Sequence, residues 1–420
     1  MIQPLPLPAP PLGRPAVWTR PLTVAYFSNT LARGGAEEHV LTLLRGLDQR
    51  RFRPALVCTP QLAEQLQADL PAGVEVQCLA PRRPAQLAAA ARLGSWFWRR
   101  RPEIVHSHLF YASLFASPLA RLAGVPVVIE TPHLREKWRQ GGLKSGYLVD
   151  RMVARGVDYF VAVSAANARY LAREKGLPER KIVTILNGCD CERFAALPAP
   201  SPELRARLGL EPGAPVLAVL GRLEPQKGHA VLLEAMPAVL RRFPRARLLC
   251  VGAGRLAEEL RARAQALGIE SAVRFAGFQS DVRPYLALAT ITVLPSFYEG
   301  LPLAAMESLA AGVTIVATAV DGTPEIVRHE ETGLLVPSGD PPALAAAINR
   351  LLQDDAWRAR LAQHGRVWVR QNFDRRRQIE STQALYLEAW RAYLSRRGRR
   401  ARAEGRWTAS PKPEREGAIP

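Results

Sequence analysis

Two glutamates stand eight positions apart in the segment "SFYEGLPLAAMESLAAG", which covers residues 296–312. We expect a helix to begin near Leu301, with Pro302 in its first turn, because proline is favoured at the first helical positions. Glu299 would then lie just before the helix, and Glu307 about 10 Å along it, at ~1.5 Å per residue. The alternatives are a capping carboxylate for Glu299 and a surface residue for Glu307.

The surroundings of Glu307, "LAAMESLAAG", are too apolar for a surface face, so a buried carboxylate there needs a partner. The separation of the two carboxylates resembles the span of a nucleotide sugar. In this interpretation Glu299 binds the hexose hydroxyls and Glu307 the ribose hydroxyls. The free N–H groups at the helix start bind the diphosphate. The residues at this start are Gly300, Leu301, Pro302 and Leu303.

Two cations, Arg222 and Lys227, lie five positions apart in "LGRLEPQKG", residues 220–228. They follow an apolar run on a loop that contains a proline and a glycine. Such a pair suits a diphosphate, because arginine binds oxygens as a fork and lysine as a point charge. The alternative is a solvated loop on a basic protein.

A pair of glycines, Gly34 and Gly35, occurs in "TLARGGAEEHV", residues 30–40. The motif follows the first apolar run and opens a helical pattern. Glycines there let the backbone approach a ligand, and a helix N-terminus favours a phosphate. An ordinary strand-to-helix turn is the alternative.

The elements that must position these residues repeat one pattern twice. Short apolar, β-branched runs alternate with helical patterns, which predicts parallel sheets covered on both faces. The fold class is therefore α/β, with two doubly wound domains and a ligand cleft between the carboxyl ends of their sheets. The runs are 22–30, 52–60, 103–108, 125–133, 159–164 and 181–188, then 216–223, 246–254, 272–278, 291–296 and 314–320.

The composition indicates a globular protein with polyanionic neighbours. Lys and Arg number 57 against 38 Asp and Glu, a net charge of +19. This excess favours nucleic acid, acidic lipid or phosphorylated substrates. The five cysteines are odd in number and scattered, so we expect them reduced, in a cytoplasmic protein. No apolar run reaches the roughly 18–20 residues that a membrane span needs.

Several motifs, in this order along the chain, resemble the retaining glycosyltransferases of family GT4, which have the GT-B fold. They are "GGAE", "HSH" (106–108), "NGCDCERF", "GRLEPQKG", the Glu-x7-Glu pair after "LPS", "DGTPEIV" and "TGLLVPSGD". The resemblance covers about residues 22–372. Three positions depart from the family pattern: Ser308-Leu309 replaces Ala-Met, Thr314 stands where proline is common, and Asp321 replaces the first of two glycines.

The resemblance implies transfer from a UDP- or GDP-sugar with retention of configuration, without a metal or other cofactor. Arg222 and Lys227 would stabilise the leaving diphosphate. His133 falls where the family places a histidine near the donor sugar, so we assign it a sugar contact, through its side chain or its backbone. His108 is a weaker candidate, and His106 is expected to point to the opposite face. Asp190 and Glu192 belong to the "NGCDCERF" match and are not interpreted as a metal site.

The domain organisation follows from the same resemblance. The N-terminal domain would handle the acceptor and the C-terminal domain the nucleotide-sugar donor. The expected segments are a disordered proline-rich leader (1–21), the Rossmann-like acceptor domain (22–195), a linker (196–214), the Rossmann-like donor domain (215–372), a C-terminal helix returning to the N-terminal domain (373–397) and a disordered basic tail (398–420).

The basic charge predicts an acceptor at a membrane. "WFWRRR" (96–101) and residues 133–156 combine arginines and lysines with aromatic residues, which suits an anionic membrane surface. We therefore expect a lipid-linked or glycolipid acceptor in cell-surface polysaccharide or lipopolysaccharide synthesis, at the inner face of the cytoplasmic membrane. The alternative is a solvated basic face. No nucleic-acid-binding motif occurs.

Two other classes of function remain open. One is a different enzyme on this fold, such as a nucleotide-sugar epimerase or a phosphorylase. The other is a catalytically idle GT-B protein that binds nucleotide sugars or acts as a scaffold. The combination of Arg222, Lys227, Glu299 and Glu307 favours the transferase over both.

Overall fold

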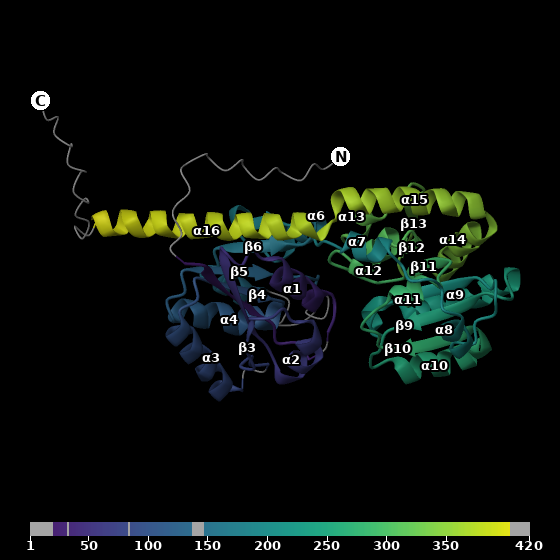
Figure 1. Ribbon diagram of the computed structural model, residues 1–420, viewed down its shortest axis with the longest axis horizontal. Coiled ribbons are helices and arrows are strands. Elements are labelled where there is room, and N and C mark those ends of the chain that lie inside the picture. The colour runs from purple at the N-terminus through teal and green to yellow at the C-terminus, as the bar shows by residue number, and fades with distance from the viewer. Residues whose placement is uncertain (1–19, 32, 83–84, 137–146, 404–420) are drawn as a thin grey trace, which may run out of the picture.

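A computed structural model describes residues 20–31, 33–82, 85–136 and 147–403. Most of the expected leader, part of the basic segment 133–156 and residues 404–420 of the expected tail lie outside these ranges. The described chain forms two lobes side by side, joined along one edge by the two last helices (Figure 1).

The N-terminal lobe is built on a seven-stranded parallel sheet in the order β3-β2-β1-β4-β5-β6-β7. The central strands are fully buried because helices cover both faces, as apolar runs such as "VVIET" require. The strands are β1 Leu22–Phe27, β2 Phe52–Val57, β3 Glu75–Gln77, β4 Ile104–His108, β5 Val127–Thr131, β6 Tyr159–Ala162 and β7 Ile182–Thr184.

The C-terminal lobe has a six-stranded parallel sheet in the order β10-β9-β8-β11-β12-β13. In each sheet the strand order reverses at the first strand, between β1 and β4 in one sheet and between β8 and β11 in the other. Folds of this kind bind ligands at the carboxyl ends of the strands beside such a reversal. The strands are β8 Val216–Leu220, β9 Arg247–Val251, β10 Val273–Gly277, β11 Ile291–Leu294, β12 Thr314–Thr318 and β13 Gly333–Val336.

The α-helices alternate with these strands, as the sequence pattern predicts. Those of the N-terminal lobe and the connection are α1 Gly35–Gly46, α2 Pro60–Leu66, α3 Leu87–Arg100, α4 Phe110–Leu122, α5 Leu148–Val153, α6 Ala165–Arg169, α7 Cys191–Ala195 and α8 Pro202–Arg207. The remainder are α9 His229–Arg242, α10 Ala257–Ala266, α11 Arg283–Leu286, α12 Leu303–Ala310, α13 Thr323–Ile326, α14 Pro341–Gln353, α15 Asp355–Asn372 and α16 Arg375–Ala403.

Three details differ from the sequence expectations. Strands β3 and β13 were not predicted, because they are three and four residues long and carry no extended apolar run. The interval 196–214 contains the helix α8. The last helix, α16, continues to Ala403, beyond the expected end at 397.

The helix that carries Glu307 begins later than predicted. Pro302 has extended backbone angles (φ −71°, ψ 117°) and precedes α12, whose first residue is Leu303. The carbonyl of Leu301 accepts a hydrogen bond from the Asn187 side chain at 3.1 Å. Because that carbonyl is occupied from outside, the first helical hydrogen bond starts at the carbonyl of Pro302 and reaches Ala305.

The helix α16 lies on the N-terminal lobe, although it follows the C-terminal lobe in sequence (Figure 1). The Tyr386 hydroxyl donates to the hydroxyl of Tyr26 on β1 at 2.9 Å and lies 2.6 Å from Nδ1 of His106 on β4. All three side chains are buried. The helix therefore fastens the two lobes together through polar contacts inside the core of the N-terminal lobe.

Tyr386→Phe should lower the free energy of unfolding by about 1–3 kcal/mol, because it leaves buried polar groups of Tyr26 and His106 without their partner. Urea denaturation measures the loss. Tyr393→Phe, at a partly buried position further along α16, is the control and should change stability little. Equal stability of the Tyr386 and Tyr393 variants would contradict this role.

Candidate active site

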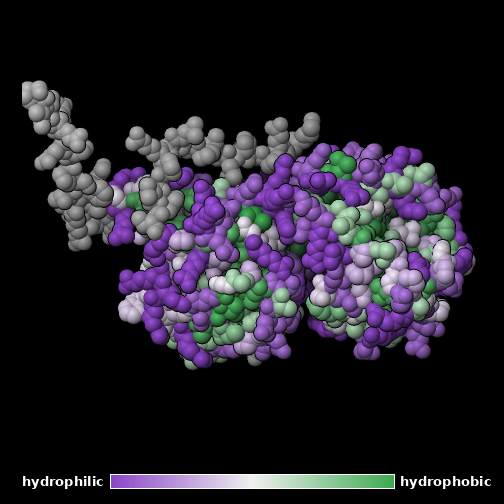
Figure 2. Space-filling view, in the orientation of Figure 1, coloured by the Kyte–Doolittle hydropathy of each residue, from purple (hydrophilic) through white to green (hydrophobic). Residues whose placement is uncertain are grey.

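Three loops from the two lobes meet between the sheets. They are the Gly34–Gly35 turn before α1, the loop after β8 and the segment before α12. A Cβ atom added at Gly34 would lie 3.7 Å from Nε of Arg222, and one added at Gly35 would lie 4.0 Å from Cδ1 of Leu303. The notch between the lobes is visible in the space-filling view, with largely hydrophilic rims (Figure 2).

Lys227 and Glu299 form an ion pair beside the start of α12. The Lys227 Nζ lies 2.6 Å from Oε1 of Glu299, and the Ser296 hydroxyl donates to the same oxygen at 2.7 Å. The Glu299 side chain is 4% exposed and that of Lys227 is 17% exposed. The predicted cation and the predicted sugar-binding carboxylate thus stabilise each other, while Arg222 is exposed on the same loop as Lys227.

The backbone around Glu299 is held by close contacts that only glycine allows. A Cβ at Gly300 would lie 1.9 Å from the carbonyl oxygen of His133, and a Cβ at Gly322 would lie 2.0 Å from the carbonyl oxygen of Gly300. Any larger residue would overlap backbone atoms. The peptide after Glu299 is therefore clamped between a strand end of the first lobe and the loop after β12.

Asp321 explains one departure from the family pattern. It has a φ of 42°, the left-handed region that aspartate tolerates better than most residues. Its Oδ2 accepts the backbone N–H of Glu299 at 2.9 Å, and its Oδ1 lies 3.8 Å from a guanidinium nitrogen of Arg135. The carboxylate thus orients Glu299, a role that a glycine side chain could not take.

Asn187 ties the two lobes together at this site. Its Nδ2 donates to the carbonyl of Leu301, and its Oδ1 lies 2.8 Å from Nδ1 of His39 on α1. The adjacent Gly188 has no room for a Cβ, which would lie 2.4 Å from Cα of Arg375. In the sequence, Asn187 belongs to the motif "NGCDCERF", which indicated only the family. The positioning role of Asn187 was not predicted.

Glu307 is partly buried on α12, one helical turn or more beyond the start. Burial and, to a smaller extent, the nearby charge of Glu38 raise the pKa of its carboxyl to about 7, although the charge of Arg193 lowers it in part. Among the described residues it makes no ion pair. A carboxylate without an ion-pair partner can accept hydrogen bonds from the hydroxyl groups of a ligand.

Glu37, in the first turn of α1, was not singled out from the sequence. It is 4% exposed, and its Oε1 accepts a hydrogen bond from the Thr30 hydroxyl at 2.7 Å. Burial raises its pKa, while the hydroxyls and the charge of Arg222 lower it in part. The available sequence signal was its position just after the double glycine. In the structure the charge of Arg222 reaches it across the cleft.

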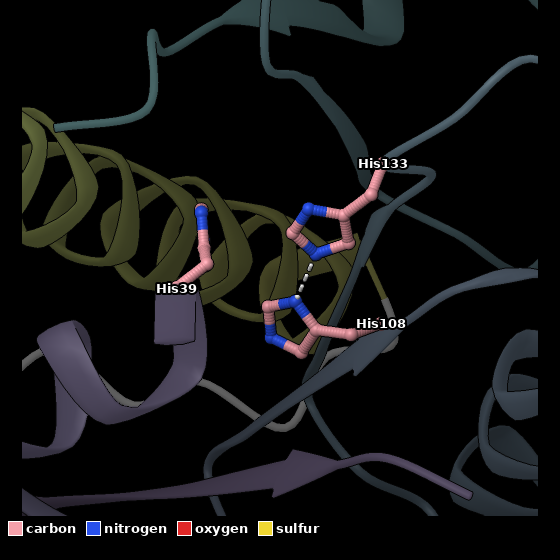
Figure 3. Close-up of side chains that lie close together, drawn as sticks. All are labelled: His39, His108 and His133. Atoms are coloured by element: carbon pink, nitrogen blue, oxygen red, sulfur yellow. Dashed lines mark hydrogen bonds between the residues drawn. The ribbon is translucent and has the colours of Figure 1, made fainter. Parts of the chain in front are cut away.

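His133 is buried two residues beyond the carboxyl end of β5. Its carbonyl oxygen faces Gly300, but its ring turns into the N-terminal lobe, where Nε2 lies 3.0 Å from Nδ1 of His108 (Figure 3). Burial and the neighbouring histidines hold its pKa well below the ordinary value, so the ring is neutral at pH 7. The structure therefore presents the backbone of His133, rather than a cationic ring, towards the loop of Glu299.

The expectation that His106 points away from His108 is wrong. Their ring centroids are 4.4 Å apart, because side chains two positions apart share one face of a strand. His106 is bonded on both ring nitrogens, to Tyr386 and to Thr131. It belongs to the core contact of α16 rather than to the cleft.

Comparisons with known proteins agree with the geometry. The family model "Glycosyltransferase Family 4" matches residues 33–193, and the model "Glycosyl transferases group 1" matches residues 200–368. A D-inositol 3-phosphate glycosyltransferase of Saccharomonospora viridis is 31% identical over 395 residues, which cover 88% of this chain and 89% of that protein.

Two further similarities are informative. A GDP-mannose-dependent alpha-(1-6)-phosphatidylinositol monomannoside mannosyltransferase of Mycobacterium tuberculosis is 34% identical over 263 residues, 60% of this chain and 67% of that protein. The crystal structure of Anabaena Alr3699/HepE in complex with UDP and glucose superposes with a TM-score of 0.77 at 21% identity. The match covers 87% of this chain and all of that one, which establishes the fold.

The raised pKa of Glu307 predicts a pH-dependent stability. Between its ordinary value of 4.5 and about 7 the carboxyl is protonated in the folded state but ionised in the unfolded chain. Stability therefore falls as pH rises through this window, by up to about 3 kcal/mol. Glu307→Gln should remove that loss, so the melting temperature of the variant should exceed that of the wild type by more at pH 8 than at pH 5.

The matched control is Glu259→Gln, at an exposed position on α10. Its difference from the wild type should be the same at both pH values. A Glu307→Gln difference that does not change between pH 5 and pH 8 would show that the folded protein does not hold Glu307 protonated.

Proposed function

The chain belongs to glycosyltransferase family 4, and we propose that it transfers a sugar from a UDP- or GDP-sugar to a lipid-linked or glycolipid acceptor with retention of configuration. The observation that carries this proposal is the Lys227–Glu299 pair at the mouth of α12, with Arg222 on the same loop. It joins a diphosphate-binding cation directly to a carboxylate suited to sugar hydroxyls.

The diphosphate would lie between the loop after β8 and the N-terminus of α12. The free N–H groups of the first helical turn favour an anion, and Arg222 can approach two phosphate oxygens as a fork. Lys227 would share its charge between Glu299 and the phosphate. Positive groups fixed at this place stabilise the negative charge that develops as the diphosphate departs.

The two glutamates would then contact opposite ends of the donor. Glu299 accepts the hydroxyls of the transferred sugar, and Glu307 accepts those of the ribose. The Anabaena complex with UDP and the GDP-mannose dependence named for the mycobacterial relative support a nucleotide donor and leave both bases open. Gly34 and Gly35 would face the phosphates across the cleft.

Transfer would need no metal, because Arg222 and Lys227 supply the positive charge at the leaving group. The acceptor hydroxyl attacks from the face that the diphosphate leaves, and the departing phosphate oxygen takes its proton. The backbone carbonyl of His133, beside Gly300, would contact the donor sugar. The ring of His133 stays neutral and does not act as the proton donor in this scheme.

A membrane-bound acceptor is supported by the surface of the N-terminal lobe. The exposed hydrophobic side chains include Trp98 on α3, Leu122 at the end of α4, and Leu148 and Met152 on α5. The helix α4 contacts both α3 and α5, and exposed arginines flank these positions. Such a mixture suits the headgroup region of an anionic bilayer.

The same surface supports a peripheral enzyme at the cytoplasmic face of the membrane, in cell-surface polysaccharide or lipopolysaccharide synthesis. None of the helices in the described part of the chain has both the length and the apolar character needed to cross a bilayer. The name of the mycobacterial relative, a phosphatidylinositol monomannoside mannosyltransferase, supports a lipid as the class of acceptor.

The alternatives are an idle nucleotide-sugar-binding protein and an epimerase. The buried, ion-paired Glu299 favours a transferase over an idle protein, because an idle protein has no need to desolvate this pair. Release of free sugar from a donor in the absence of acceptor separates a working transferase from an idle one.

Arg222→Ala and Lys227→Ala should each lower turnover at least about a hundredfold, the loss expected when a partner of transition-state charge is removed. Donor hydrolysis and transfer to a lipid extract measure this effect. Arg261→Ala is the control, because Arg261 is an exposed arginine on α10 that pairs with Glu258 of the same helix. Near-normal turnover in both site variants would contradict the diphosphate assignment.

The protein should co-sediment with vesicles that contain acidic lipids and not with neutral vesicles. Each basic residue at such a surface contributes on the order of 1 kcal/mol, and binding should weaken as salt rises. Replacing Arg99, Arg100 and Arg101 by Glu should abolish co-sedimentation.

The charge-matched control replaces Arg241, Arg242 and Arg245 in the C-terminal lobe, which should leave binding intact. A truncation after Ala403 tests the contribution of residues 404–420. Equal binding of the wild type and the Arg99–Arg101 variant would assign the attraction to another surface.

A further inference from the structure

Three buried imidazole rings converge inside the N-terminal lobe. His39 comes from α1, His108 from the end of β4 and His133 from the segment that follows β5, and their rings face one another (Figure 3). One nitrogen from each ring can be chosen so that all three lie within 4.8 Å of one another. In the described part of the chain, this is the one group of three or more histidine, cysteine or carboxylate side chains so arranged.

The hydrogen-bonding capacity of these rings is not exhausted. The Nε2 atoms of His39 and His108 are buried and have no partner among the described residues. Buried polar atoms are rarely left unpaired, because each costs a desolvation penalty that nothing returns. Two such atoms in one cluster indicate that a ligand of the rings completes it.

The surroundings of His39 resemble the outer shell of a metal ligand. Its Nδ1 lies 2.8 Å from Oδ1 of Asn187 and 2.8 Å from Nε2 of Gln378 on α16. An Nδ1–H can donate only to the Asn187 oxygen, because Nε2 of Gln378 is itself a donor, and this tautomer leaves the lone pair of His39 on the orphaned Nε2. Metal-binding histidines are oriented in this way by a hydrogen bond on the opposite ring nitrogen.

We propose that His39, His108 and His133 together bind one divalent transition-metal ion of the zinc class. Neutral imidazoles are preferred ligands of Zn²⁺, Co²⁺, Ni²⁺ and Cu²⁺, whereas Mg²⁺ and Ca²⁺ prefer oxygen, which this cluster does not offer. Three histidines with an open fourth position form a common zinc arrangement.

The separations permit this with small side-chain rotations. The chosen nitrogens lie within 4.8 Å of one another, against the roughly 3.3 Å between two nitrogens that share a tetrahedral ion at ~2.0–2.1 Å. The widest pair has to approach by about 1.5 Å at most, on the same estimate. Rotation of ring planes about their side-chain bonds supplies a movement of this size.

The ion would link α1, β4 and the segment after β5 at the point where His133 meets Gly300. It would lie on the acceptor side of the cleft, and it would not take part in the charge balance of the diphosphate, which Arg222 and Lys227 supply. The proposal is therefore independent of the proposed transfer reaction and can be tested without any sugar donor.

The test adds Co²⁺ and then Zn²⁺ to the full-length, chelator-treated protein. We expect one Co²⁺ per chain, with the intense visible absorption of a tetrahedral site, without a thiolate charge-transfer band, and displaced by one equivalent of Zn²⁺. The melting temperature should rise with Zn²⁺. His39→Gln and His108→Gln should each weaken binding at least tenfold, the loss typical of even a second-shell change.

The matched control is His229→Gln in the C-terminal lobe. His229 is also buried, with both ring nitrogens lacking a partner among the described residues, but it lies outside the cluster. This variant should bind Co²⁺ as the wild type does. Circular dichroism of each variant reports folding separately from metal affinity.

Three results would overturn the proposal. The first is a wild-type protein that shows no tetrahedral Co²⁺ spectrum. The second is a thiolate band, which would assign the ion to cysteine. The third is binding that survives in folded His39→Gln and His108→Gln. Because none of these readouts involves sugar transfer, they leave the proposed enzymatic function untouched.

Discussion

The backbone of Gly300 lies against the carbonyl oxygen of His133, and this contact sets how closely the two lobes approach. Behind it, Gly322 lies against the carbonyl of Gly300, so three backbone segments are stacked without side chains between them. Because the stack leaves no space for a Cβ, a side chain at Gly300 or Gly322 would force these segments apart. The N-terminus of α12, the Glu299 carboxylate and the cation loop all take their positions from this contact.

Hydrogen bonds from distant segments complete the arrangement. Asn187 binds the carbonyl of Leu301 and thereby delays the start of α12, while Asp321 accepts the N–H of Glu299. Burial also affects the charges of the two glutamates. Lys227 neutralises the buried Glu299, and burial raises the pKa of Glu307, further along α12, to about 7. The exposed Arg222 adds positive charge near the N-terminus of α12, and a diphosphate that binds there requires such charge.

The sequence was sufficient to predict the features that depend on local patterns. The alternation of apolar runs and helices predicted both sheets, and of the site residues singled out from the sequence, Lys227 and Glu299 are in direct contact. Two of the misses depend on long-range contacts. The start of α12 depends on Asn187, 114 positions before Leu301, and the histidine cluster joins residues from three separate elements. The strands β3 and β13 are too short to give a periodic signal.

We propose that the cleft binds a nucleoside diphosphate, with its phosphates at α12 and its ribose at Glu307. Calorimetric titration of UDP and GDP, in a buffer that contains a chelator, measures this directly for the wild type and Glu307→Gln. We predict that at least one diphosphate binds the wild type without added metal. Its affinity should fall about tenfold or more in Glu307→Gln, the effect of losing about 1.4 kcal/mol of hydrogen bonding to the ribose. Failure of both diphosphates to bind, or equal binding to both proteins, would contradict this assignment of the cleft.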